Sequence, residues 1–91
     1  MYYELHVTMD GDPVIIQPLV ELINWKFSCI DGDPDLGPGK KCYATTHLNA
    51  TKNDFNDVMQ NLNFAADYLE GHTDATVLRK KIELVMYDKR L

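Results

Sequence analysis

The fold is decided by residues 41–71, KCYATTHLNATKNDFNDVMQNLNFAADYLEG, where a strand pattern gives way to a helix pattern. Side chains from Lys41 to Leu48 alternate in polarity, which predicts a half-buried strand. Beyond it, Thr51 is the expected helix cap, with Asp54 three residues on, and Gly71 is the expected helix end. The apolar residues between these limits recur at helical spacing: Phe55, Val58, Met59, Leu62, Ala65, Ala66 and Leu69.

The N-terminal half predicts a second alternating strand, a turn, a short helix and a third strand. Tyr2 to Met9 alternates, and Asp10-Gly11-Asp12-Pro13 is typical of a turn. A helix begun at Pro13 would be broken by Pro18, so we expect the helix to start near Pro18. Trp25 to Ile30 is the next expected strand. Residues 31–39, DGDPDLGPG, predict a loop.

The C-terminal segment, Ala75 to Tyr87, predicts the last strand. Its two sides differ in polarity, with an expected apolar set of Leu78, Ile82, Leu84 and Met86 and an opposite set of Arg79, Lys81 and Glu83. The resulting order, βαββαβ, predicts a single α+β domain over residues 1–91. We expect a ferredoxin-like sandwich, a four-stranded antiparallel sheet with two helices on one face. Right-handed crossovers place the first and third strands at its centre and the fourth beside the first.

Composition narrows the classes of function. A net charge of −5 argues against general DNA or RNA binding, which normally needs a basic stripe. The sequence has neither the pattern of a secretory signal nor an apolar run long enough to cross a membrane, so we expect a cytoplasmic protein. Cys29 and Cys42 are not at metal-ligand spacing, and we expect both to be reduced and buried. No metal or cofactor is expected.

Two short triplets mirror each other in the predicted strands: His6-Val7-Thr8 and Thr45-Thr46-His47. Strand side chains alternate faces, so the histidine and the outer threonine of each triplet share a face. If the two strands pair antiparallel, an imidazole and a hydroxyl from each meet on the helix-free surface. That surface would suit acid–base chemistry on a phosphate, or it would be a polar sheet face wetted by solvent.

The phosphate interpretation follows from what phosphodiester chemistry requires. Histidine can both take a proton from an attacking oxygen and give one to a leaving oxygen near neutral pH. The other phosphate oxygens need donors, which threonine hydroxyls and the cations Arg79 and Lys81 would supply. The plainer interpretation of these two cations is cross-strand pairing with Glu4 or Glu83.

Residues 6–8 match the H-x-T motif of the two-histidine (2H) phosphoesterase superfamily, and the chain resembles a single lobe of those proteins. The resemblance implies that His6 is an acid or base and that Thr8 donates to a phosphate oxygen. Members of the family use two such motifs, one from each lobe. Here either His47 replaces the second motif within one sheet, or two chains dimerise to complete the cleft.

The tail also resembles that of small uncharacterised H-x-T proteins with an R-x-K-I-E segment followed by D-x-R. The matching residues are Arg79, Lys81, Ile82, Glu83, Asp88 and Arg90. Our first hypothesis is a metal-independent phosphoesterase or phosphate-binding protein acting on a small phosphorylated ligand, a nucleotide or an RNA end. Its catalytic residues would be His6 and His47, and its phosphate-binding residues Thr8, Thr45, Arg79 and Lys81. The alternative is a non-catalytic ferredoxin-like module that forms a homodimer or binds a partner through its open sheet face.

Overall fold

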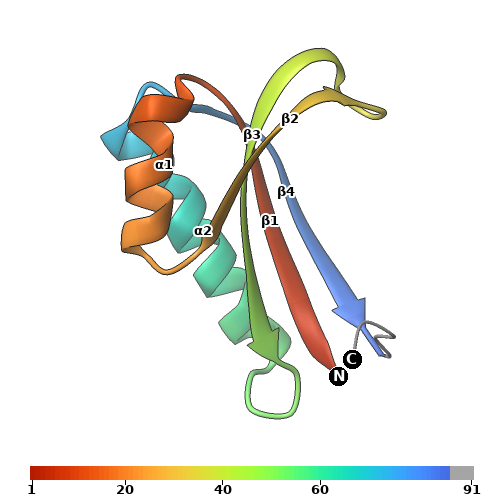
Figure 1. The fold of residues 1–91 in the computed structure, drawn as a ribbon. Coiled ribbons are helices and arrows are strands. Elements are labelled where there is room, and N and C mark those ends of the chain that lie inside the picture. The colour runs from red at the N-terminus through yellow and green to blue at the C-terminus, as the bar shows by residue number, and fades with distance from the viewer. Residues whose placement is uncertain (87–91) are drawn as a thin grey trace.

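The computed structural model describes residues 1–86 and has the predicted element order, βαββαβ (Figure 1). Within these residues the chain is an α+β protein with one four-stranded sheet and two helices. Its elements are β1 (Tyr2–Asp10), α1 (Pro13–Leu22), β2 (Lys26–Asp33), β3 (Gly37–Asn49), α2 (Phe55–His72) and β4 (Thr76–Val85). Among the described residues, no helix is both long and apolar enough to span a bilayer.

The sheet has the order β2-β3-β1-β4, with every neighbouring pair antiparallel. The predicted central pair, β1 and β3, is therefore confirmed, as is the place of β4 beside β1. In this register His6 lies opposite Thr45, and Glu4 lies opposite His47. Paired residues of an antiparallel ladder point to the same face, so both triplets meet as their mirror order predicted.

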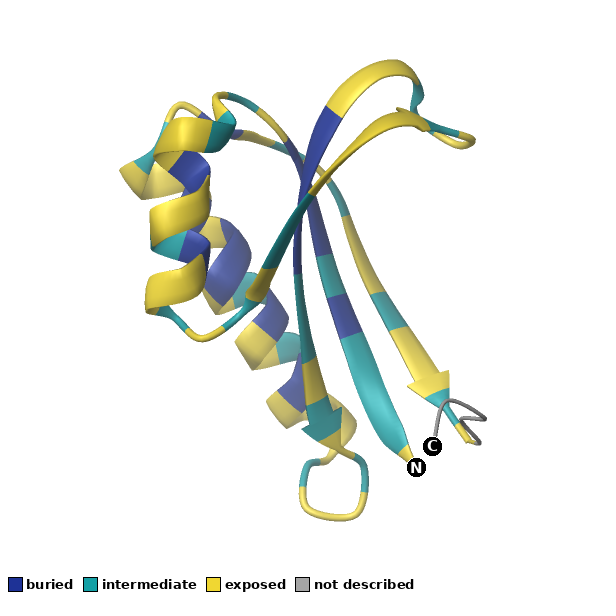
Figure 2. Ribbon diagram, viewed as in Figure 1, coloured by how far each residue is buried: buried dark blue, intermediate teal, exposed yellow. Residues whose placement is uncertain are grey.

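Both helices pack against one face of the sheet, and the core lies between these layers (Figures 1 and 2). The alternation of β1 is confirmed, because Leu5, Val7 and Met9 are completely buried. Further core side chains are Ile16, Val20, Cys42, Ala44, Val58, Leu62, Ala66, Leu69 and Ala75. Within residues 1–86, no helix covers the opposite face of the sheet (Figure 1).

Helix α1 begins at Pro13, and the prediction that it starts near Pro18 is wrong. Asp12 caps it by accepting a hydrogen bond from the backbone N–H of Val14, and a proline in the first turn loses nothing. Pro18 lies inside the helix and cannot donate to the carbonyl of Val14, four residues earlier. Val14 is 80% exposed, so this missing hydrogen bond lies in an exposed turn of the helix, and the helix continues to Leu22.

Helix α2 is capped three residues later than predicted. Asp54 is the N-cap, and its side chain accepts from the backbone N–H of Asp57 while Asp57 accepts from that of Asp54. This is a reciprocal capping box. The hydroxyl of Thr51 instead donates to the side chain of Asn49 in the preceding turn. The helix runs one residue beyond Gly71, to His72.

Residues 31–39 form the end of a β-hairpin, and only residues 34–36 lie outside its strands, whereas the sequence predicted a loop throughout. β2 continues to Asp33 and β3 starts at Gly37, with Gly32 and Gly37 at φ values of +80° and +86° that favour glycine. The hairpin extends beyond the helices (Figure 1). Cys29 is consequently exposed, contrary to expectation, whereas its cross-strand neighbour Cys42 is buried. Burial, and then the nearby Cys29 thiol, raise the pKa of Cys42 to about 11.

A β-bulge changes which side chains of β4 point toward the helices. Thr8 pairs with Arg79 but Met9 pairs with Val77, so Leu78 is an extra residue in the ladder. Val77 packs on the core in place of Leu78, which is 40% exposed. Ile82 packs against the core as predicted, whereas Leu84 and Met86 of the predicted apolar set are 49% and 69% exposed. The strand ends at Val85, and the predicted positions Tyr87, Asp88 and Arg90 lie outside the described residues.

Candidate functional site

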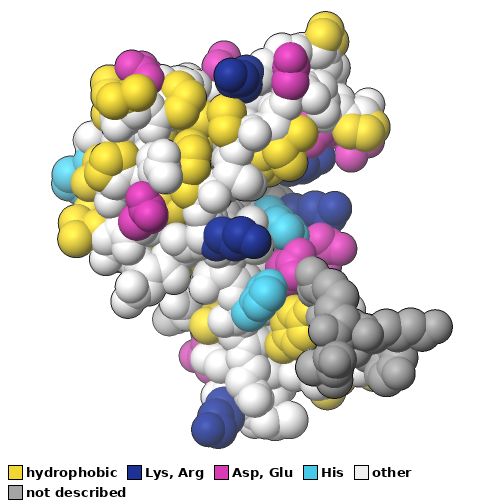
Figure 3. Space-filling model, viewed as in Figure 1, with side chains coloured by type: hydrophobic (Ala, Val, Ile, Leu, Met, Phe, Trp, Pro, Cys, Tyr) yellow, Lys and Arg dark blue, Asp and Glu magenta, His cyan; other side chains and the backbone are white. Residues whose placement is uncertain are grey.

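The helix-free face of the sheet gathers polar side chains from all four strands. Basic, acidic and histidine side chains lie next to one another on this face (Figure 3). The strand registers arrange them in three rows: Lys26–Thr45–His6–Lys81, Ser28–Tyr43–Thr8–Arg79 and His47–Glu4–Glu83. Most of these side chains belong to one of two groups, each held together by its own hydrogen bonds and ion pairs.

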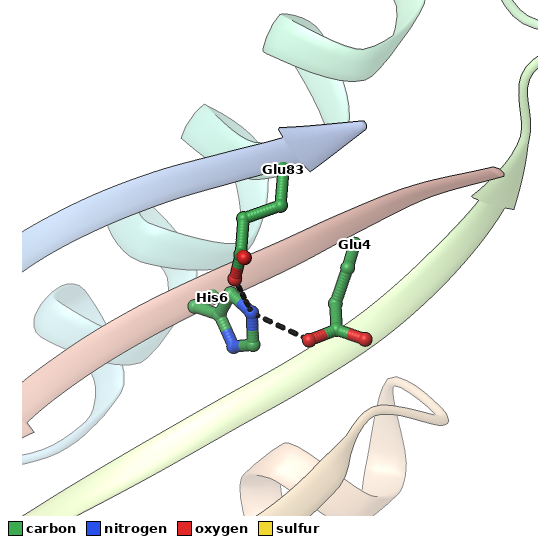
Figure 4. Close-up of side chains that lie close together, drawn as sticks. All are labelled: Glu4, His6 and Glu83. Atoms are coloured by element: carbon green, nitrogen blue, oxygen red, sulfur yellow. Dashed lines mark hydrogen bonds and ion pairs between the residues drawn. The ribbon is translucent and has the colours of Figure 1, made fainter. Parts of the chain in front are cut away.

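The first group, which we call the histidine cluster, consists of Glu4, His6, Thr45, His47 and Glu83. His6 is at its centre, with 19% of its side chain exposed. Its Nδ1 lies 3.1 Å from the hydroxyl of Thr45. Its Nε2 lies 2.8 Å from an oxygen of Glu4 and 2.9 Å from one of Glu83 (Figure 4). One ring nitrogen therefore faces two carboxylates.

Glu4 joins the two histidines. While one of its oxygens faces His6, the other lies 2.8 Å from Nε2 of His47. The two imidazoles thus share one carboxylate on the same side of the sheet. The side chain of His47 is 52% exposed, and its ring centroid is 4.8 Å from that of Tyr2. His47 is accordingly the histidine more open to a ligand, and His6 is the more enclosed.

The second group, which we call the arginine network, consists of Thr8, Asp33, Asp35, Tyr43 and Arg79. One terminal nitrogen of Arg79 donates to Asp33 at 3.0 Å and to the hydroxyl of Thr8 at 3.3 Å. The other donates to Asp35 at 3.3 Å. Thr8 is completely buried beneath these contacts. Arg79 is thus held by the carboxylates of the hairpin, although its buried Nε has no partner within residues 1–86.

Asp33 is the best-satisfied acid on this face. One of its oxygens accepts from the hydroxyl of Tyr43 at 2.7 Å and from Arg79, and the other accepts from the backbone N–H groups of Asp35 and Leu36. The hydrogen bonds from Tyr43 and from the backbone of Asp35, together with Arg79, lower its pKa to about 2. Burial, and its bond to this carboxylate, raise the pKa of Tyr43.

Two adjoining hollows flank His6, and both are lined by His6, Ser28 and Thr45. The larger, of about 480 Å³, extends to Lys26 and His47, and it is within the usual size of small-ligand pockets, about 300–1,000 Å³. The smaller, of about 270 Å³, extends to Arg79, Lys81 and Glu83. Together they form a groove along the helix-free face.

Lys26 is the cation that this groove leaves available. Within residues 1–86, its ammonium group makes no hydrogen bond and no ion pair, whereas Lys81 lies 3.7 Å from Glu83 and Arg79 is bound by two aspartates. Lys26 pairs with Thr45 in the ladder and lines the larger hollow. A free ammonium beside hydroxyls and an imidazole is suited to an anionic group.

The structure brings together some of the predicted site residues and separates others. His6, His47 and Thr45 lie together, and Lys81 lies at the edge of the groove. Thr8 and Arg79 belong to the arginine network instead, and the hydroxyl of Thr8 is occupied by Arg79. Sequence reasoning missed Lys26. Its alternation with Ser28 and Ile30 was the available signal, since all three point to the helix-free side.

The site offers proton carriers, hydroxyl donors and ligands for a cation. Glu4, His6 and Glu83 place three potential metal-ligand atoms within 4.8 Å of one another. The two imidazoles offer a pair of groups for proton transfer. Comparison of the chain with protein-family models, with curated proteins and with solved structures found no match.

Proposed function

We propose that this chain has a ferredoxin-like fold and that its groove binds a small phosphorylated ligand, a nucleotide or an RNA end, and cleaves its phosphodiester. The order β2-β3-β1-β4 and the succession βαββαβ support the fold assignment. The observation that carries the function is that both imidazoles share Glu4 at a groove that also holds the unpaired Lys26. A cytoplasmic location, where such ligands are available, belongs to the same proposal.

The chemistry assigns proton transfer to the two histidines. The attacking oxygen gives its proton to one imidazole as it forms a bond to phosphorus, and the other imidazole protonates the leaving oxygen as the bond between phosphorus and the leaving oxygen breaks. Glu4 is hydrogen-bonded to His47 and lies 2.8 Å from Nε2 of His6, so it holds the two imidazoles close together at the groove. The exposure of His47 lets it reach a leaving or attacking group directly, and His6 acts from the floor of the groove.

Anion binding is assigned to a different set of donors from the one that the sequence motif implies. Thr8 is buried and Arg79 is held by Asp33 and Asp35, so neither is available to a phosphate without breaking the arginine network. Lys26 and the hydroxyls of Ser28 and Thr45 line the larger hollow beside the histidines. These three groups are the proposed phosphate donors, and Lys81 adds positive charge on the far side of His6.

A panel of metal-free assays tests this function. The panel contains 2′,3′-cyclic nucleotides, 2′-5′-linked and 3′-5′-linked dinucleotides, each with a chelator present. We expect turnover of at least one member, and a loss of about 10²- to 10⁴-fold in His6→Ala and His47→Ala, because each change removes one acid–base group. Lys26→Ala should weaken binding of the same substrate.

The third histidine provides the matched control. His72 ends α2 and bonds the backbone carbonyl of Tyr68, away from the groove, so His72→Ala should leave turnover unchanged. Melting temperatures of all variants establish that each is folded. If the wild-type protein neither binds nor cleaves any member of the panel, the proposed function is wrong.

The second candidate function is an interaction module that uses the same face. Ile30, which is 50% exposed, lies beside the groove with the exposed Lys81, and this mixture also suits a protein surface. In that case Lys81→Glu should change the oligomeric state, a homodimer included, as measured by light scattering. It should leave the oligomeric state unchanged if the groove serves a small ligand.

A further inference from the structure

We propose that Glu4, His6 and Glu83 form a binding site for a divalent transition metal of the Zn²⁺ type. Their ligand atoms lie within 4.8 Å of one another and come from two adjacent strands (Figure 4). Glu4 and His6 are two residues apart on β1, and Glu83 on β4 lies directly opposite Glu4. The proposal goes beyond the phosphodiester function and does not depend on it.

The first argument is the mismatch between donors and acceptors at Nε2 of His6. This nitrogen is 2.8 Å from Glu4 and 2.9 Å from Glu83, but a ring nitrogen carries at most one hydrogen. A single N–H aimed at one oxygen leaves the other oxygen poorly bonded. A metal ion bonded to all three atoms removes this mismatch, because each ligand then contributes a lone pair to the same cation.

The second argument is the chemistry of the ligands. One imidazole nitrogen and two carboxylate oxygens are typical zinc ligands, with bonds of about 2.0–2.2 Å and a fourth position left for water. Such bonds place tetrahedral ligands roughly 3.3–3.5 Å apart. Nε2 of His6 lies 2.8 and 2.9 Å from the two oxygens, about half an ångström closer than such a site requires, and the two oxygens are within 4.8 Å of each other. Rotation of the two glutamate side chains can make this adjustment.

The third argument is the support around these ligands. Nδ1 of His6 lies 3.1 Å from the hydroxyl of Thr45, and an N–H donated to that oxygen leaves Nε2 free to bind a metal. The second oxygen of Glu4 is held at 2.8 Å by His47. Metal-binding histidines and carboxylates commonly have such outer partners, which fix the direction of the ligand.

Local charge points the same way. Glu4 and Glu83 are like charges directly opposite each other in the ladder, which is destabilising in the absence of a cation. Lys81 approaches only Glu83, at 3.7 Å. A divalent ion would neutralise both carboxylates. Because it would occupy Nε2 of His6, it would also remove that nitrogen from proton transfer, so metal binding and the proposed turnover would exclude each other.

The test is a titration of the full chain, carrying no polyhistidine tag, with Zn²⁺ alone. We expect one ion per chain by calorimetry, and a change in the ¹⁵N chemical shift of His6 Nε2 that saturates at the same ratio. His6→Ala, Glu4→Gln and Glu83→Gln should each weaken binding by about 100-fold or more, because each removes a ligand. Thr45→Val removes only an outer partner and should weaken binding by roughly 10- to 100-fold.

Two variants control for adventitious binding to surface groups. His72→Ala removes an imidazole and Glu21→Gln removes a carboxylate from helices away from the cluster, and neither should change the affinity. Equal affinity of the wild type and of Glu83→Gln would overturn the proposal, as would saturation without a shift at His6. Because the titration contains no phosphodiester, its result is independent of the assays that test the proposed function.

Discussion

The arginine network and the histidine cluster lie on the same side of one sheet, but they differ in how many hydrogen-bond donors their carboxylates have. In the arginine network, both oxygens of Asp33 accept two hydrogen bonds each. In the histidine cluster, two glutamates compete for one nitrogen of His6. Donors are therefore plentiful around Asp33 and scarce around His6.

This difference separates a structural group from a binding group. The arginine network fastens the β2–β3 hairpin to β4 and buries Thr8, so its charges are used within the protein. The histidine cluster is open to the groove and has an excess of acceptors, which a proton, a metal ion or a ligand can satisfy. Clustered polar residues on one sheet face thus have to be judged by their bonding partners as well as by their types.

The largest effect on stability is expected from Arg79→Met. This change removes the donor to the buried hydroxyl of Thr8 and releases Asp33 and Asp35. An unpaired buried polar group costs about 1–3 kcal/mol, which lowers the melting temperature by on the order of 10 °C in a domain of this size. Lys81→Met, on the same strand and face, is the matched control and should change the free energy of unfolding by less than about 0.5 kcal/mol. Similar losses of stability in Arg79→Met and Lys81→Met would contradict the structural role of the arginine network.

A pH series tests the donors around Asp33. Its pKa is about 2 in the folded protein against an ordinary value of 3.8, so the folded state binds this proton less tightly than the unfolded state. The resulting stability is fully present above about pH 4 and is lost as the pH falls toward 2. In urea denaturation, Asp33→Asn should be less stable than the wild type at pH 6, and the difference should shrink by pH 2.

The control for that series is Asp67→Asn, a change at an exposed position of α2. Its difference in free energy of unfolding from the wild type should not vary with pH in the same way. A constant difference between Asp33→Asn and the wild type across the range would show that Asp33 titrates normally.

The smallest effect is expected in the histidine cluster, and it has the opposite sign. Without metal, Glu83→Gln removes one of two opposed carboxylates and supplies an amide donor, so it should stabilise the protein by about 0.2–1 kcal/mol. Thermal unfolding with a chelator present measures this effect. A clear loss of stability would mean that the charge of Glu83 is satisfied in the folded protein. The histidine cluster would then resemble the arginine network.

Much of the sheet could be predicted from alternation alone. The patterns of Tyr2–Met9 and Lys41–Leu48 determine which side chains reach the core, and the mirrored triplets then place His6 opposite Thr45. This works because a pleated strand has a strict period of two. The proximity of both histidines to Glu4 follows from the same register, since Glu4 lies opposite His47.

Other features depend on contacts between distant segments. The sequence assigned Arg79 to phosphate, but the hairpin brings Asp33 and Asp35 onto it, and no local pattern reports a contact across 46 residues. The start of α1 differs from the prediction because the helix passes through Pro18, although this residue has no N–H to donate to Val14. A strand predicted at Trp25 to Ile30 without its two faces does not indicate that Lys26 points to the groove; the register with Thr45 does.

The bulge in β4 has a consequence for how the chain tolerates changes in length. Leu78 is the residue that the ladder does not need, so deleting it joins Val77 to Arg79 without altering which way any later side chain points. Deleting Lys80, only two positions further on, would use up the same extra residue but would place Leu78 opposite Thr8 and Arg79 opposite Val7, on the helix side. The position of a single-residue deletion therefore decides whether Arg79 can still reach Asp33.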